Sequence, residues 1–272
     1  MGDDDEIIGR IDAYCDAVPR QRARAEEFGS LVLFVPVGAS HPYYARPRAF
    51  PRHPVSAADM RSVLARQREL LIPESFEWIE QAAPEMAAAA ALAGLRVHAH
   101  PLLVLGELAP PPGLPSRVSA GVLDADDPDV VPAWAVPAVA FGHPGTAIGG
   151  ATVTERDKIT ASHDPLIVKA LRERLRSGQS VLAAARGPNG PLGAGSYQLD
   201  GDVAELTGVG VLPASRRRGL GAAVTHALAA HALARGATTV FLSASDAAVA
   251  RIYARLGFRE VGTSMIAEPA GP

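Results

Sequence analysis

Three arginines and two glycines occur together at residues 216–221, between a stretch typical of a strand and a stretch typical of a helix. The first stretch, 203–212, alternates and then becomes apolar, and Pro213 ends it because proline has no N–H for strand pairing. The second stretch repeats its apolar residues at helical spacing: Leu220, Ala223, Val224, Ala227 and Leu228. A loop between a strand and a helix leaves unpaired N–H groups at the positive end of the helix dipole. With the arginines beside them, these groups predict a phosphate or pyrophosphate site.

The rest of the C-terminal half supplies the elements that would hold this loop in place. Apolar runs bounded by turn residues predict strands at 117–123, 180–185, 192–199, 238–243 and 258–266. Apolar residues at helical spacing and capping residues predict helices at 165–176, 220–235 and 247–256. Residues 128–141 stay ambiguous, because Pro132 and Pro137 would each cost about 3 kcal/mol inside a helix while their apolar neighbours fit a buried element.

The N-terminal half predicts a smaller α/β domain. Its patterns indicate helices at 3–18, 57–70 and 84–92, strands at 31–37, 72–79 and 96–105, and a loop at 41–54. The helix at 84–92 is expected to begin with Pro84 in its first position. Four of the seven residues in 109–115 are prolines, which leaves no room for a regular element. We therefore predict domains at 1–108 and 116–272, joined by a linker at 109–115.

Composition excludes several classes of protein. The 272 residues are 48% apolar, which supports a substantial core, and the net charge of −3 argues against general nucleic-acid binding. The single cysteine, Cys15, has no partner for an internal disulfide. No apolar run of about 18 residues occurs and the N-terminus is acidic, so a membrane span and a signal peptide are not expected. We expect a cytoplasmic protein that binds neither nucleic acid nor membrane.

Two motifs give the chain a family resemblance. The first is GVGVLPASRRRGLG, and the second is SDAAVARIYARLGF at residues 245–258, with one helix and one strand between them. Both resemble the GNAT superfamily of acyl-CoA-dependent N-acetyltransferases, in which a loop with arginine or glutamine and two glycines precedes a helix. The matching loop residues are Arg216, Gly219 and Gly221, and Arg217 departs from the family, which more often has glycine there. The resemblance covers about residues 116–270.

The resemblance implies a fold and a donor. The fold would be α/β (α+β), with a mixed, mostly antiparallel sheet flanked by helices. The donor would be acetyl-CoA, bound as a co-substrate, with its pyrophosphate on the loop and its pantetheine arm along the end of the preceding strand. Asp246 stands where the family often has asparagine near pantetheine, although helix capping is the stronger interpretation. The implied donor-binding residues are Val209, Gly210, Val211, Arg216, Arg217, Arg218, Gly219, Leu220, Gly221 and Asp246.

Two residues are candidates for the chemistry of acetyl transfer. An alkylamine is mostly protonated at pH 7, and removing its proton costs about 4–5 kcal/mol, so a general base is useful. Glu205 is our candidate for this base, acting directly or through a water, and a solvent-facing carboxylate is the alternative interpretation. Tyr253 resembles the family's general acid toward the leaving sulfur. A phenol is a weaker acid than a thiol, so we expect a hydrogen bond to the developing thiolate rather than full proton transfer.

The N-terminal half contains a segment that parallels the second motif. A helix, a glycine and a strand follow one another around Gly94 as they do around Gly257, and Ala90 stands where Tyr253 stands. No counterpart of the arginine–glycine loop precedes this segment. If the halves are related, the N-terminal one is a degenerate copy that serves structure or acceptor binding, and each chain has one active site.

The leading hypothesis is direct transfer of an acetyl group from acetyl-CoA to a primary amine of a small molecule. The alternatives are a non-catalytic acyl-CoA-binding module and an acetyltransferase that modifies protein N-termini or lysines. We expect no metal, because His98 and His100 share a strand face without an evident third ligand. A monomer and a homodimer are both compatible with the sequence.

Overall fold

The computed structural model describes residues 2–37, 44–49 and 53–270 of the chain, which form two compact units. The first unit takes in the described parts of 1–103, 243–246 and 260–272, and the second comprises 104–242 and 247–259. The chain crosses between them four times: within strand β5 (Leu95–Leu105), near the end of strand β10 (Thr239–Ser243), after Asp246, and within strand β11 (Phe258–Pro269). The linker and domain boundaries expected from the sequence stay a prediction.

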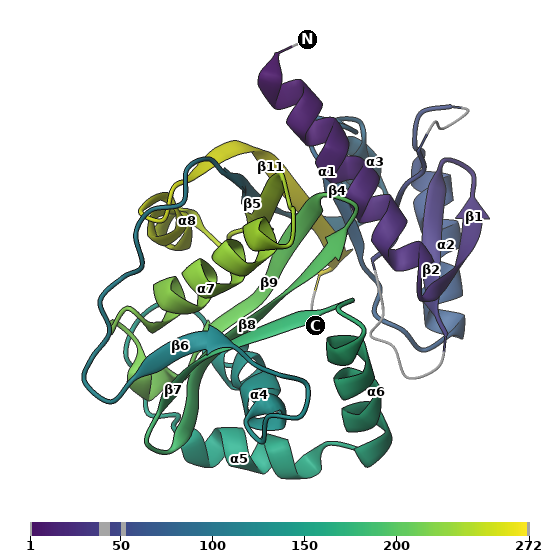
Figure 1. Ribbon diagram of the computed structural model, residues 1–272. Coiled ribbons are helices and arrows are strands. Elements are labelled where there is room, and N and C mark those ends of the chain that lie inside the picture. The colour runs from purple at the N-terminus through teal and green to yellow at the C-terminus, as the bar shows by residue number, and fades with distance from the viewer. Residues whose placement is uncertain (1, 38–43, 50–52, 271–272) are drawn as a thin grey trace. The chain divides into compact units, whose positions relative to one another are not determined.

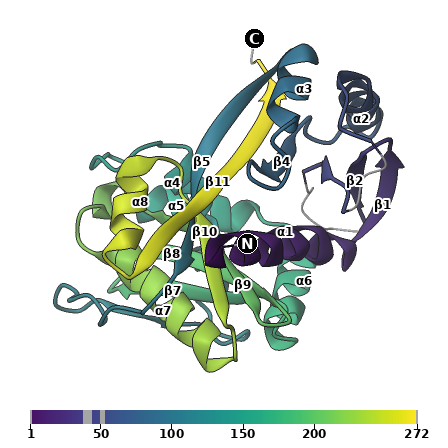
Figure 2. The same ribbon diagram turned by 90° about the horizontal axis from the view of Figure 1, so that it is seen from above.

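The first unit contains three helices and two sets of strands among its described residues. Besides its parts of β5 and β11, its elements are α1 (Asp3–Arg20), β1 (Ala23–Phe28), β2 (Leu31–Pro36), β3 (Arg46–Pro47), α2 (Ala57–Glu69), β4 (Phe76–Ile79) and α3 (Met86–Leu92). Strands β1, β2 and β3 form one sheet, and β11 lies between β4 and β5 (Figure 2). One core cluster joins α2 and α3 to β4 through Met60, Trp78 and Met86, which are all buried.

Most predicted elements of this half are confirmed, with four differences. Strand β4 begins at Phe76 and not at 72, and strand β1 was not predicted. Helix α3 begins at Met86, so Pro84 precedes the helix and does not occupy its first position. The predicted loop at 41–54 contains the two-residue strand β3, and its residues 41–43 and 50–52 lie outside the described residues. Short elements such as β3 and β4 carry too few residues for a clear periodic pattern.

The second unit contains the predicted loop and its supporting elements. These are β6 (Ser119–Val122), α4 (Val130–Phe141), α5 (Val153–Ser162), α6 (Pro165–Arg176), β7 (Val181–Gly187), β8 (Gly190–Asp200), β9 (Val203–Val211), a 3₁₀ turn (Pro213–Ser215), α7 (Leu220–Ala234), β10 (Thr239–Ser243) and α8 (Ala247–Ala254). The strand order within this unit is β10-β9-β8-β7-β6. Figure 1 labels β9, β8, β7 and β6 of this order. The pairs are antiparallel except for β9 with β10, which is parallel. The predicted mixed, mostly antiparallel sheet flanked by helices is confirmed.

Helices α4 and α7 cover opposite faces of strand β8. A Cβ atom added to Gly193 or Gly195 would contact Leu220 or Leu228 of α7. Ala194, whose side chain points the other way in the strand, packs in a cluster with apolar residues of α4. The loop before α7 and the end of α4 therefore lie on opposite faces of the sheet, near the same strands.

The ambiguous segment 128–141 forms helix α4 in spite of its prolines. Pro132 lies in the first turn, where the missing N–H has no intrahelical partner in any case. Pro137 lies inside the helix, and its backbone is close to strand β9: a Cβ atom added to Gly210 would lie 3.2 Å from Pro137 Cα. Tight packing of a strongly apolar helix on the sheet outweighs the lost hydrogen bond.

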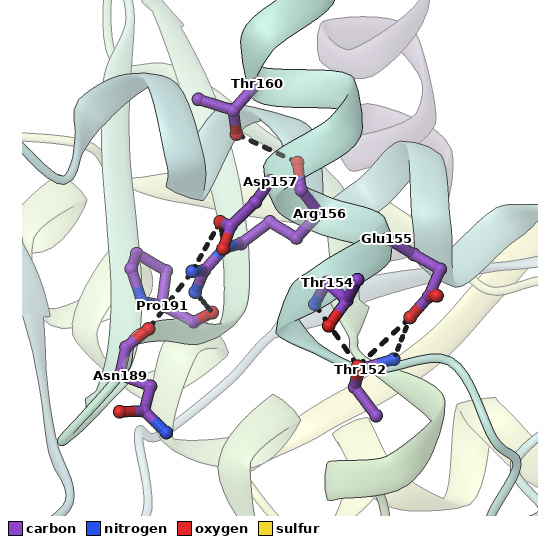
Figure 3. A network of polar contacts seen from close by, with 8 residues as sticks. All are labelled: Thr152, Thr154, Glu155, Arg156, Asp157, Thr160, Asn189 and Pro191. Atoms are coloured by element: carbon purple, nitrogen blue, oxygen red, sulfur yellow. Dashed lines mark hydrogen bonds and ion pairs between the residues drawn. The ribbon is translucent and has the colours of Figure 1, made fainter.

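Helix α5 was not predicted, and its position depends on a buried arginine. Thr152 and Glu155 form a capping box at its start, with the Thr152 N–H donating to Glu155 Oε2 at 2.7 Å (Figure 3). Arg156 is only 5% exposed and donates to Pro191 O at 2.7 Å and Asn189 O at 3.0 Å. These bonds attach α5 to the turn of the β7–β8 hairpin (Figure 3).

No helix among the described residues is long and apolar enough to cross a membrane.

Candidate functional site

Strand β9 separates from its neighbour β10 at the position that the sequence predicts for pantetheine. The two strands pair only from Val203 with Thr239 to Glu205 with Phe241. Beyond Glu205, the described residues of β10 give β9 no partner, while β9 stays paired with β8 up to Val211. The backbone groups of 206–210 on this side are therefore left for another partner, while Val211 O accepts from Arg216 Nε at 3.4 Å. Glu205 lies where the strands part.

A bulge and a close approach shape the end of β9. Two residues, Gly208 and Val209, lie opposite the single Gly195 of β8, and Gly208 has a φ of +63°. Gly210 lies close to α4, since an added Cβ atom would be 2.8 Å from Ala140 Cβ. The bulge itself lies at Gly208 and not at Gly210. Both glycines allow the strand end to bend while it packs on α4.

The loop that follows presents a row of unpaired N–H groups. Within the described part of the chain, no acceptor is found for the N–H groups of residues 217–222, and the first helical bond is from Ala223 N to Gly219 O at 3.0 Å. Gly219 has a φ of +76° and begins α7, and Leu220 is buried beneath the loop at 1% exposure. Gly221 lies in the first turn, where an added Cβ atom would be 3.4 Å from Val211 Cγ2.

Helices α2, α5 and α6 begin with a side-chain cap, whereas α7, like α1, α3 and α4, has no side-chain bond from its N-cap residue. The Ser56 hydroxyl accepts from Asp59 N at the start of α2, and Asp164 accepts from Leu166 N at the start of α6. Thr152 does the same at the start of α5. Gly219 has no side chain to play this part, so the dipole and the free N–H groups of α7 are open to an anion.

The three arginines of the loop lie in different environments. Arg217 and Arg218 are exposed, and Arg217 has a φ of +60°, a backbone conformation that glycine adopts without strain. This explains why glycine suits the position in the resembling family. Arg216 is half-buried, and its guanidinium donates to backbone carbonyls of the protein itself: Val211, Ala140, His143 and Ala147. The sequence did not indicate these partners.

Tyr253 is held inside the unit by helix α8. It is 8% exposed, its ring lies 6.1 Å from that of Phe258 in an edge-on arrangement, and α8 packs against α7. Burial raises the pKa of Tyr253 to about 12. The phenol is therefore protonated at neutral pH and can donate a hydrogen bond.

The remaining predicted residues have the following positions. Asp246 directly precedes α8, belongs to the first unit, and accepts from Ser245 Oγ at 3.1 Å. His98 Nε2 lies 3.5 Å from Glu268 Oε1, and His100 Nδ1 lies 3.2 Å from Ser245 O. The described residues contain no group of three side chains able to hold a metal ion.

A cavity of about 470 Å³ opens near the C-terminal ends of α6 and α7, and none of the predicted site residues lines it.

Comparison with known families gives one match. The family described as "Acetyltransferase (GNAT) family" matches residues 143–258, which include the loop and Tyr253. Among curated proteins, none matches the chain by sequence.

Solved structures share the fold over almost the whole chain. A GCN5-related N-acetyltransferase from Kribbella flavida is 25% identical, with a TM-score of 0.66 over 97% of this chain and 96% of its own. A tandem GNAT protein from the clavulanic acid biosynthesis pathway is 17% identical, with a TM-score of 0.53 over 99% and 97%. A GCN5-related N-acetyltransferase-like protein from Streptococcus suis is 11% identical, with a TM-score of 0.53 over 97% and 98%. The last two similarities concern the fold alone.

Proposed function

We propose a specific reaction for this protein, whose residues 143–258 belong to the GNAT acetyltransferase family and which is an acetyl-CoA-dependent N-acetyltransferase. It transfers the acetyl group directly to a primary amine of a small molecule. The amine nitrogen attacks the thioester carbonyl carbon, a C–N bond forms, the C–S bond breaks, and CoA leaves as the thiol. The amine releases one proton, and the sulfur takes up one.

The observation that carries the proposal is the combination of a separated strand and an uncapped helix start. The free N–H groups of 217–222 suit the pyrophosphate, and Arg217 and Arg218 add positive charge at the surface. The edge of Val209, Gly210 and Val211 that β10 leaves uncovered suits the amides of pantetheine, which need alternating donors and acceptors, and of these three residues Val211 already accepts from Arg216 Nε. In this arrangement the pantetheine arm takes the place of the missing strand partner.

Glu205 is our proposed base because it lies at the fork between β9 and β10. From this position a carboxylate, or a water held by it, accepts the proton of the attacking amine. An amine with a pKa near 10.4 needs such help, whereas an α-amine near 7.7 costs only about 1 kcal/mol to deprotonate at pH 7. Alkylamines should therefore depend on Glu205 more strongly than α-amines.

Tyr253 is our proposed hydrogen-bond donor to the leaving sulfur. With its pKa at about 12, full proton transfer to a thiolate whose pKa is about 8.5 would be uphill by about 5 kcal/mol. A hydrogen bond that strengthens as charge develops on sulfur is the better use of the group. The proton that CoA finally gains then comes from solvent. The sequence-based expectations of a cytoplasmic monomer or homodimer without a metal stay part of this proposal.

A turnover assay tests the proposal against its alternatives. The full chain is incubated with acetyl-CoA and three classes of acceptor: small alkylamines, α-amines, and peptides with a free N-terminus or lysine. Release of free thiol with small amines is the expected result. Transfer only to peptides would replace the small-molecule acceptor with a protein acceptor. Tight CoA binding without thiol release in any class would identify a non-catalytic binding module.

A further inference from the structure

The Arg216 guanidinium joins two pieces of backbone that are far apart in the sequence, residues 140–147 and Val211 at the end of β9. Its Nη2 donates to Ala140 O at 3.0 Å and His143 O at 2.6 Å, and its Nη1 donates to Ala147 O at 3.1 Å. Its Nε reaches Val211 O, at the end of β9, at 3.4 Å. A guanidinium carries five N–H donors in a rigid fork, so one side chain can satisfy four carbonyls in different directions.

Two backbone hydrogen bonds connect the same two regions as this side chain. Gly149 N donates to Pro213 O at 3.1 Å, and Ala214 N donates to Ala151 O at 3.0 Å. Together with Arg216 they attach residues 141–150, which we call the strap segment, to the end of β9 and the turn after it.

Burial does not hold the strap segment in place. All of its residues are exposed except Thr146, which is half-buried, and even Phe141 and Ile148 are 62% and 64% exposed. Hydrophobic packing therefore contributes little to its position. Its first residues are bonded to α4, with Gly142 N donating to Ala138 O and His143 Nδ1 lying 3.0 Å from Val139 O. Its described bonds to the end of β9 and the turn after it are those of Arg216 and of the two backbone pairs.

The positive charge of Arg216 also interacts favourably with the protein itself, at the end of helix α4. Ala140 is the next-to-last residue of α4, so its carbonyl lies at the negative end of that helix dipole. A cation at a helix C-terminus is stabilised there. The side chain therefore points its charge and its donors into the protein, although the sequence motif suggests a pyrophosphate contact.

We propose that Arg216 is a positioning residue that fixes the strap segment against the donor-binding end of β9. This inference rests on the proposed function, because it assigns the strap segment to the wall past which the acceptor amine reaches the acetyl group. An attacking nitrogen must come within about 3 Å of the carbonyl carbon, and a misplacement of about 1 Å can cost about 10²-fold in rate. Arg216 therefore acts on acceptor attack, while the free N–H groups of the loop bind CoA.

The test compares Arg216→Lys and Arg216→Gln with the unchanged chain in three measurements. Lysine keeps the charge but lacks the planar fork, so it cannot serve all four carbonyls. The dissociation constant of CoA should change less than threefold. The value of kcat/KM for the acceptor should fall about 10²-fold or more in both variants. Hydrogen exchange should become faster in 141–150, and at Gly149 N in particular, but not in α7.

Arg156 supplies the matched control. Like Arg216, it is an arginine whose guanidinium donates to backbone carbonyls of the protein, and it is buried. Arg156→Lys should lower the unfolding midpoint while KM for the acceptor and exchange in 141–150 stay as in the unchanged chain. If this variant does not fold, Arg172→Lys replaces it, because Arg172 donates to Ala125 O and Asp127 O outside the site.

Two results would overturn the inference. A tenfold or greater loss of CoA affinity in Arg216→Lys would make the guanidinium a phosphate ligand. Unchanged kcat/KM and unchanged exchange in 141–150 would mean that the strap segment is held without it. Absence of turnover in the unchanged chain would contradict the proposed function instead. The dissociation constant of CoA and hydrogen exchange in 141–150 would still decide the role of Arg216.

Discussion

Helices α3 and α8, one in each compact unit, end with the same backbone conformation, which α6 and α7 also adopt at Gly178 and Gly236. Helix α3 is followed by Gly94 with a φ of +82°, and α8 is followed by Gly257 with a φ of +97°. In both cases the glycine N–H closes the last turn, onto Ala91 O at 3.0 Å or Ala254 O at 3.1 Å, and a long strand follows. Local sequence is sufficient for this device, since a left-handed glycine after a helix is a common way to end it.

The two copies differ in what lies against them. A Cβ atom added to Gly257 would lie 1.8 Å from Glu107 O, whereas one added to Gly94 would have nothing within 4 Å. Four residues before each glycine, Tyr253 is buried in the second copy and Ala90 in the first. The backbone conformation is therefore shared, and the proposed chemistry depends on Tyr253, which has no counterpart in the first copy, and on the loop before α7.

Alanine at the two glycines should show the largest difference between the copies. Gly257→Ala adds overlap with a backbone oxygen to the strain of a left-handed residue, and we expect it to destabilise the protein by about 3 kcal/mol or more. Gly94→Ala adds only the strain, about 1 kcal/mol. Urea unfolding of both variants measures this. Equal losses would contradict the distinction between the two glycines.

The next largest effect is expected at the position four residues before the glycine. Tyr253→Phe should lower kcat about 10²-fold, because the leaving sulfur loses its donor, and should leave the dissociation constant of CoA unchanged. Tyr197→Phe is the control, as this buried tyrosine donates to or accepts from His231 Nδ1 at 2.7 Å outside the site. It should change stability without changing kcat. Full activity of Tyr253→Phe would leave the second copy with no catalytic advantage over the first.

The smallest effect concerns pH. The pKa of Tyr253 is raised to about 12 by burial, against about 10 in an unfolded chain. Between pH 10 and 12 the unfolded state has lost this proton and the folded state has kept it, so stability falls as pH rises. Over this window the free energy of unfolding should fall less in Tyr253→Phe than in the unchanged chain, by up to about 2 kcal/mol. Urea unfolding at each pH measures this difference. The difference between the two proteins should stay constant from pH 7 to 9.

Much of the second unit could be predicted because its apolar patterns are long and are bounded by clear capping or turn residues. Asp164 caps α6 as expected, and the turn before Gly190 joins a hairpin of 7 and 11 residues. Helix α5 was missed because it buries almost none of its side chains and so lacks a periodic apolar face. The capping box of Thr152 and Glu155 was the signal that could have located its start.

The role of Arg216 was beyond the reach of sequence reasoning. Its acceptors are backbone carbonyls, which every residue type has, and they lie 69 to 76 residues away along the chain. Helix α4 was ambiguous for a related reason, since its packing on the sheet, including the close approach to Gly210, offsets the cost of Pro137. Contacts that depend on backbone atoms or on close approach leave no pattern in the side-chain sequence.

The central claim is that the loop before α7 binds the pyrophosphate of acetyl-CoA, and calorimetric titration with CoA tests it most directly. Arg218→Ala combined with Gly219→Ala removes a surface charge and crowds the free N–H groups. The control combines Arg176→Ala with Gly178→Ala, which removes an exposed arginine and a left-handed glycine at the end of α6. We predict that the first variant binds CoA at least tenfold more weakly and that the control binds it normally. Equal CoA affinity in the first variant and the unchanged chain would contradict the claim.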